Sequence, residues 1–263
     1  MIKRELKNNL KSFIIWTLIL LAIFLVVFLV YPFILTDDSV KNLDEMMKVF
    51  PPELLKAFNM DLASINSVYG WLKSEGFMFV LIIVGIYSSM LGSNILLKEE
   101  SDKTIEYIGF LPIKRKDIVT SKIIVSIFYI FLMVIILGIF NYIGLTLSCD
   151  FNKSEYLLLC ISPLLIALPL FSLNLFISTF MHKTKKTIGI SLGLVFVFYL
   201  INVLSELSKN IEFIKYFSIY TLANIRNIIT NGNINLLVII LSIFITGLFT
   251  SLSYIRYNKK ELI

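Results

Sequence analysis

Charged residues are scarce in this chain of 263 residues, where Asp, Glu, Lys and Arg together make up 16%. An ordinary soluble domain carries about 25% charged residues and about 45–50% apolar ones, whereas 57% of this chain is hydrophobic. Both departures indicate that lipid, rather than water, surrounds most of the protein. The formal net charge of +6 would favour nucleic-acid binding in a soluble protein, but its distribution along this chain follows a membrane pattern instead, and no nucleic-acid partner is expected.

Motifs for catalysis and for cofactor binding are also missing. The chain has no G-x-x-x-x-G-K-S/T phosphate loop, no H-E-x-x-H zinc motif and no G-x-S-x-G nucleophile turn. The one histidine, His182, lies in a basic loop, where we expect it to be solvated rather than to bind a metal. Cys149 and Cys160 are expected to be unpaired, because Cys160 is predicted to lie inside a helix. We therefore predict that the chain is not an enzyme and binds no cofactor itself.

What the sequence does contain is a series of long apolar runs. Each run is free of charge and long enough to cross a hydrocarbon core of about 30 Å as a helix. The first is too long for a cleavable signal peptide and is expected to be retained. The pattern predicts an all-α membrane protein, a single transmembrane domain over residues 1–263, with six spans at about 13–35, 77–97, 123–147, 156–180, 187–204 and 234–255.

The lack of charge within the spans bears on transport. Ion-coupled transporters commonly place ionisable residues within the membrane, and these spans offer mainly hydroxyl and amide groups. If the protein moves a cargo, the energy is expected to come from another subunit. Gly189 and Gly193 in the fifth span have a spacing that permits close helix contact, although ordinary membrane glycines are an equal alternative.

The distribution of Lys and Arg predicts the orientation. With the N-terminus in the cytoplasm, 16 of these residues fall in inside segments and 8 in outside segments. Because cytoplasmic loops carry the excess of positive charge, we expect both termini to be cytoplasmic in a multi-pass protein of the plasma membrane.

Two flanking segments show helical patterns of their own. Residues 1–12 place apolar side chains at helical spacing with basic residues between them, which predicts an amphipathic helix at the lipid headgroups, with a frayed basic tail as the alternative. The outer loop, 36–76, holds an apolar pattern around Leu43 and another after Pro51-Pro52. It is expected to form short helices that contact a substrate or simply pack on the spans.

The most informative segment is the cytoplasmic loop at 98–122. Ile105 and Ile108 share one face of a short predicted helix, Gly109 can end that helix and Pro112 prevents its continuation. Basic residues follow at Lys114–Lys116, so the acidic and the basic residues lie in different parts of the loop. This coupling loop is expected to form a compact knob that docks on a cytoplasmic partner. The alternative is a solvated loop with no partner.

The loop resembles the coupling segment of type-2 ABC transporter permeases. That family has an acidic pair, a Thr near an acid, an apolar helix, a Pro followed by Arg, and a Lys that opens the next span. The positions that match are Glu99, Glu100, Thr104, Glu106, Pro112, Arg115 and Lys122. Lys103 stands where the family often has Gly. The outer stretch FPPELLKAFNM also resembles a recurring feature of the family.

The resemblance implies the membrane half of an ATP-driven ABC exporter. A dimer of a separate ATP-binding subunit would bind ATP and Mg and dock on the loop, and a second permease chain, identical or related, would help to enclose the path. Arg115 and the pair Glu99 and Glu100 would contact that ATPase or hold the fold of the loop, and Ile105, Tyr107 and Ile108 would form the docking face. The docking residues implied in all are Glu99, Glu100, Thr104, Ile105, Glu106, Tyr107, Ile108, Pro112 and Arg115.

The cargo is expected to be an amphipathic molecule such as an antimicrobial peptide, because relatives of this kind often handle such peptides. Two other functions stay open at this point. A non-transporting membrane anchor or signalling subunit would also explain a docking knob without chemistry. An ATP-independent channel is disfavoured, because the spans hold no charge.

Overall fold

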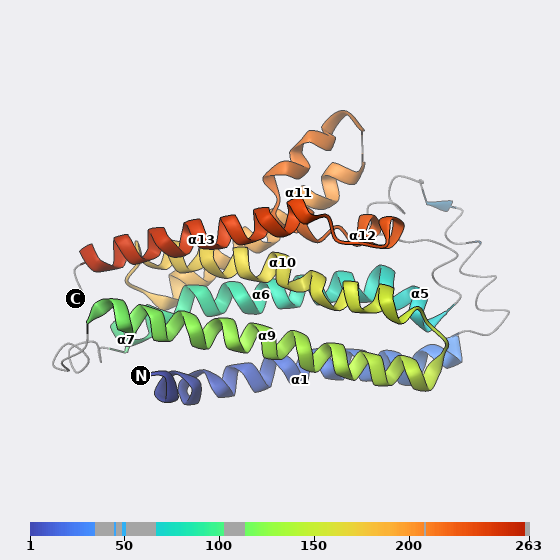
Figure 1. The fold of residues 1–263 in the computed structure, drawn as a ribbon, viewed down its shortest axis with the longest axis horizontal. Coiled ribbons are helices and arrows are strands. Elements are labelled where there is room, and N and C mark those ends of the chain that lie inside the picture. The colour runs from blue at the N-terminus through green and yellow to red at the C-terminus, as the bar shows by residue number, and fades with distance from the viewer. Residues whose placement is uncertain (35–44, 46–48, 51–66, 103–113, 208, 261–263) are drawn as a thin grey trace.

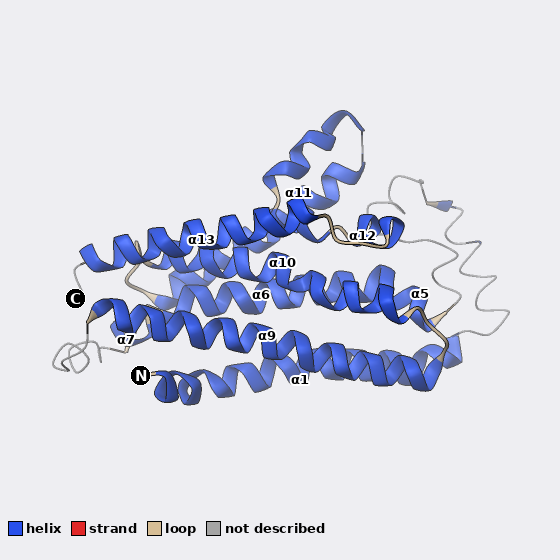
Figure 2. Ribbon diagram, in the orientation of Figure 1, coloured by secondary structure: helices blue, strands red, loops and turns tan. Residues whose placement is uncertain are grey.

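The computed structural model describes residues 1–34, 45, 49–50, 67–102, 114–207 and 209–260. Within these residues the chain consists of helices and the loops between them (Figure 2). Among the described residues, six helices are long and apolar enough to cross a membrane, which agrees with the predicted number of spans. They are α1 (Ile2–Ile34), α6 (Phe77–Ile95), α9 (Arg115–Ser148), α10 (Lys153–Ser178), α11 (Thr184–Leu207) and α13 (Leu236–Lys259).

Shorter helices occupy the connections. α5 (Val68–Trp71) and one π-helical turn, η1 (Leu72–Gly76), lead directly into α6. α7 (Lys98–Ser101) follows α6, and α11 and α13 are joined by η2 (Lys209–Phe217), η3 (Ile219–Ala223) and α12 (Ile225–Asn231). The helices predicted around Leu43 and after Pro51-Pro52 fall largely outside the described residues.

The bundle is built around the pair α6 and α10, which pack along each other and bury most of their surfaces. α9 and α1 cover one side of this pair (Figure 1). α13 packs against α10, and α11 packs against α6. Both termini lie at the same end of the bundle, beside α7, and we call this the termini end. α5 and α12 lie at the opposite end, the distal end.

α1 is a single continuous helix of 33 residues, about 50 Å long at 1.5 Å per residue. The structure therefore does not confirm a separate interfacial helix over residues 1–12. That segment contains no Gly or Pro that would break the helix. It also turns a polar face inward, because Glu5 and Asn9 are buried, so its first turns pack against the bundle.

α10 contains Pro163 and Pro169 and yet runs as one helix from Lys153 to Ser178. Cys160 lies inside it, and Cys149 follows the end of α9. Both cysteines are free, as expected from the sequence.

Small residues allow α6 to approach α10 closely. A Cβ atom built at Gly92 would overlap the backbone carbonyl oxygen of Phe171 on α10, and one at Gly85 would meet Leu170 at 3.2 Å. Helices in membranes associate largely through such close packing. The Gly189 and Gly193 pair on α11 behaves differently, because nothing lies within 4 Å of either Cβ position. Those two glycines make no close helix contact within the described chain.

We predict that Gly92→Ala lowers the thermal stability of the purified protein. The new methyl group would meet a backbone oxygen, which cannot rotate away, so α6 and α10 must separate at a cost of roughly 1–3 kcal/mol. The matched control is Gly193→Ala, which meets open space and should raise stability slightly through its higher helix propensity. Thermal unfolding in detergent micelles would compare the two, and equal melting temperatures would contradict this account of the packing.

Candidate functional site

The acidic pair predicted in the coupling loop lies on α7, at the termini end. Glu99 and Glu100 are only 7% and 6% exposed, although both belong to a four-residue helix outside the six spans. A buried carboxylate requires compensating charge and hydrogen bonds. Their partners come from α1, α9 and the residues around α13, and they form two ionic clusters.

The first cluster is centred on Lys122 of α9, a lysine that is 1% exposed. Its Nζ lies 2.7 Å from both carboxylate oxygens of Glu99 and 2.6 Å from the carbonyl oxygen of Ile95. It also lies 3.4 Å from Oε2 of Glu5 on α1. The ammonium group has three N–H donors, and these acceptors are enough to satisfy them away from water.

Arg4 balances the charge of this cluster. Its guanidinium lies 3.0 Å from Oε1 of Glu5 and 3.3 Å from Oε1 of Glu99. Two carboxylates therefore face two cations, Lys122 and Arg4. Near-zero net charge is what makes burial of ions tolerable in a medium of low dielectric constant. We call these four residues the Lys122 cluster.

The second cluster ties α7 to the C-terminal segment. Nζ of Lys260, just after α13, lies 2.8 Å from Oε2 of Glu100 and donates to the carbonyl of Met181 at 2.6 Å. Burial lowers the pKa of Lys260, and the hydrogen bond to Glu100 opposes that shift. Nδ1 of His182 lies 3.5 Å from the same carboxylate oxygen, although this histidine is largely exposed, as expected.

Arg115 connects the start of α9 to the end of α13. It is the first residue of α9, and its Nη1 donates to the carbonyl of Lys260 at 2.9 Å and to that of Asn258 at 3.4 Å. The last carbonyls of a helix have no partner within the helix, and the guanidinium supplies one. The side chain itself is exposed.

The structure thus brings together three of the residues predicted for docking: Glu99, Glu100 and Arg115. Their contacts within the chain favour the second of the two roles considered, which is to hold the fold of the loop. The burial of Glu99 and Glu100 leaves little of either carboxylate for a partner. Thr104, Ile105, Glu106, Tyr107, Ile108 and Pro112 lie outside the described residues.

Residues 115–122 belong to α9, so the later part of the predicted loop is helical. Sequence reasoning noted Lys122 as the residue that opens the third span, but it missed Glu5 and Lys260. Glu5 is the one acid among the basic residues of the first twelve. That isolated acid was the available signal.

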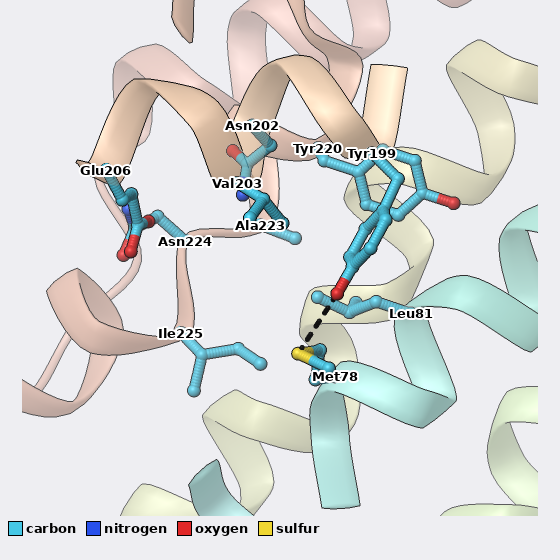
Figure 3. Close-up of a pocket in the computed structure, with 10 residues that line it drawn as sticks. All are labelled: Met78, Leu81, Tyr199, Asn202, Val203, Glu206, Tyr220, Ala223, Asn224 and Ile225. Atoms are coloured by element: carbon cyan, nitrogen blue, oxygen red, sulfur yellow. Dashed lines mark hydrogen bonds between the residues drawn. The ribbon is translucent and has the colours of Figure 1, made fainter. Parts of the chain in front are cut away.

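The distal end has a small cavity between α6, α11 and the segment of η3 and α12 (Figure 3). Its volume is about 30 Å³, which is room for about one water molecule. The Tyr199 hydroxyl points toward Met78 and lies 3.3 Å from its sulfur atom. Glu206 lies at the opposite side of the cavity. This cavity is too small for a peptide or a drug-like cargo.

Comparison with known proteins adds the decisive observation. The family model for the ABC-2 family transporter protein matches residues 1–262. The chain belongs to the ABC-2 transporter family. Comparisons with curated proteins and with solved structures gave no match.

Membership of the ABC-2 family confirms the resemblance seen in the coupling loop. The chain is a multi-pass membrane protein and the permease subunit of an ABC transporter. Such permeases are generally not catalytic, and they typically work with an ATP-binding subunit. The two ionic clusters surround α7, which is the first part of the predicted loop at 98–122.

We predict that Lys122→Met strongly destabilises this ABC-2 chain. Removing the ammonium leaves Glu99 and Glu5 buried with Arg4 as their one remaining cation in the cluster, and breaking a buried pair in this way costs roughly 3–5 kcal/mol. The exposed Lys116→Met serves as the control and should change stability by less than about 0.5 kcal/mol. Thermal unfolding in detergent measures both.

A double variant separates lost charge from lost packing. Glu99→Gln combined with Lys122→Met removes one unpaired carboxylate and should recover part of the loss. If the double variant is less stable than Lys122→Met alone, the buried charge is not the cause.

Proposed function

We propose that this chain is the transmembrane permease subunit of an ATP-driven ABC exporter, and that a separate ATP-binding subunit docks on the coupling loop at the termini end. ATP and Mg would be bound by that partner and not by this chain. The termini end would then face the cytoplasm, in keeping with its larger share of Lys and Arg, and the membrane would be the plasma membrane.

The observation that carries this proposal is the bonding of α7, where the coupling loop begins. Glu99 joins α7 to Lys122 on α9 and to Arg4 on α1, and Glu100 joins it to Lys260 beyond α13. α7 also follows α6 directly in the chain. A force applied to the loop would therefore reach α6 through the chain itself, and α1, α9 and α13 through short ion pairs.

Two groups of residues would have different roles at this site, one in docking and one in holding the base of the loop. Ile105, Tyr107 and Ile108 would form the docking face, since an apolar face between two charged segments suits a partner surface. Glu99 and Glu100 would keep the base of the loop rigid, and Arg115 would connect it to the end of α13. Movement of the ATP-binding subunits would then tilt the spans rather than bend the loop.

A second permease chain, identical or related, would complete the path. α11 and α13 bury little of their surfaces within this chain, and large side chains such as Phe196 and Phe244 are each 62% exposed. Faces of this kind must meet lipid or another chain. The small size of the cavity in Figure 3 also supports a path between two chains rather than through that part of one.

The cargo we propose is amphipathic, with antimicrobial peptides as the leading class. Support comes from the apolar, charge-free spans, whose surfaces suit the apolar face of such a molecule. A path bounded by these surfaces would favour hydrophobic peptides over small ions.

The proposal is tested by purifying the protein from its native membrane in mild detergent and assaying what comes with it for ATP hydrolysis. We expect a stoichiometric nucleotide-binding partner. Ile108→Asp should reduce its recovery about tenfold or more, because a charge placed in an apolar interface must be desolvated. Lys185→Asp is the control, a charge change in the first turn of α11 at the same end, and should leave recovery unchanged.

Two further results would decide between the candidate functions. Arg115→Glu should keep the partner bound but uncouple ATP hydrolysis from transport, with the thermal melting temperature little changed. If the chain purifies alone and no ATPase activity accompanies it, the exporter proposal fails. The membrane-anchor function would then take its place.

A further inference from the structure

A long groove lies between α9 and α10 in the distal half of the bundle, and no step of the proposed transport uses it. Its volume is about 530 Å³, within the range of about 300–1,000 Å³ that is usual for ligand sites. Its walls come from two faces, Val134, Ile135, Gly138, Ile139 and Tyr142 on α9 and Lys153, Tyr156, Leu157, Cys160, Ile161 and Leu164 on α10.

The groove opens toward the membrane. Ile135, Ile139, Leu157 and Ile161 line it and are each at least half exposed in the chain alone, at 53%, 57%, 59% and 50%. These side chains belong to helices that are apolar enough to span the bilayer. Whatever fills the groove therefore enters it from the hydrocarbon region.

Its length matches one leaflet of a bilayer. Along α10 the lining residues run from Lys153, the first residue of the helix, to Leu164. At 1.5 Å per residue this is about 16 Å, and half of a hydrocarbon core of about 30 Å is about 15 Å. A groove that starts at the helix end and stops near the bilayer centre has the reach of a single acyl chain.

The buried tyrosine of the groove, Tyr156, has its hydroxyl satisfied within the protein. The Tyr156 hydroxyl donates to the carbonyl oxygen of Gly138 at 2.7 Å, and this bond fixes the two helices to each other. Gly138 has no side chain, and a Cβ there would meet only Cys160, whose Sγ is 3.4 Å away. The groove therefore presents mainly apolar surface to its occupant, and Gly138 leaves one position of its α9 wall without a side chain.

A cation stands at the mouth of the groove. Lys153 is exposed, and we expect it near the phospholipid headgroups because it is the first residue of a helix long and apolar enough to span the bilayer. The charged residues next to it in the chain are Asp150 and Glu155, and Glu155 is engaged by Lys73 at 3.5 Å. An ammonium at the end of a hydrocarbon groove complements a phosphate attached to an acyl chain.

We propose that this groove is a binding site for one membrane phospholipid, whose acyl chain lies between α9 and α10 and whose phosphate contacts Lys153. Close-packed proteins and bilayers leave few voids of this size, because the atoms lining a void lose their contacts. A bound lipid would complete the contact between these two spans at the distal end. This inference does not depend on docking at the termini end.

Native mass spectrometry tests the proposal directly. The purified full chain is incubated in mild detergent with palmitoyl-oleoyl phosphatidylglycerol, and the fraction carrying one lipid is measured. Gly138→Phe fills the groove and should reduce that fraction about tenfold or more. Gly247→Phe on α13 is the matched control, since nothing lies within 4 Å of that position, and it should bind as the unmodified chain does.

The contribution of the headgroup is measured separately. Lys153→Gln should weaken binding of phosphatidylglycerol but leave binding of the diacylglycerol with the same chains unchanged. Equal effects on both lipids would overturn the role of Lys153. Where Gly138→Phe fails to fold by circular dichroism, Ile161→Trp at the exposed rim replaces it and should give the same loss.

Two results would overturn the lipid site altogether. One is equal lipid binding by the unmodified chain and Gly138→Phe. The other is a loss of dimer mass in Gly138→Phe with no bound lipid in the unmodified chain, which would assign the groove to a second copy of this chain.

Discussion

Lys122 carries a positive charge into a place with almost no access to water, and the positions of α1, α7 and α9 depend on how that charge is compensated. Glu99 approaches it from α7 and Glu5 from α1, while Arg4 balances the second carboxylate. Because a buried ion costs several kcal/mol unless it is paired, these three helices cannot move independently. Their shared cluster makes the termini end a rigid base.

The interior of the membrane region is held by a different constraint. There the spans carry no charge, and α6 meets α10 through the missing side chain of Gly92, which lets a backbone carbonyl approach. Without a hydrophobic driving force between helices in lipid, such close packing takes its place. The chain thus combines ionic contacts at its termini end with close steric packing at its centre.

Much of the fold could be predicted because lipid imposes a strong rule on the sequence. Each span needs about twenty apolar residues, and the part of the chain that the structure describes contains six helices of that kind. The family could be recognised because the motif that carries the resemblance is local. The inward polar face of α1 and the burial of Lys260 could not be predicted. Glu5 bonds to Lys122 at a separation of 117 residues, and Lys260 bonds to Glu100 at a separation of 160. No local pattern marks such pairs.

The sequence by itself determined that lipid surrounds most of the protein, how many spans it has and which family it belongs to, because these follow from composition and from short-range motifs. Tertiary structure alone decided that Glu99 and Glu100 turn inward, that α1 continues through its basic segment, and that α9 and α10 leave a groove beside Gly138. The physical reason is that burial and charge pairing are properties of helices brought together in space. A carboxylate on a short helix reads the same in sequence whether it faces water or a lysine from another span.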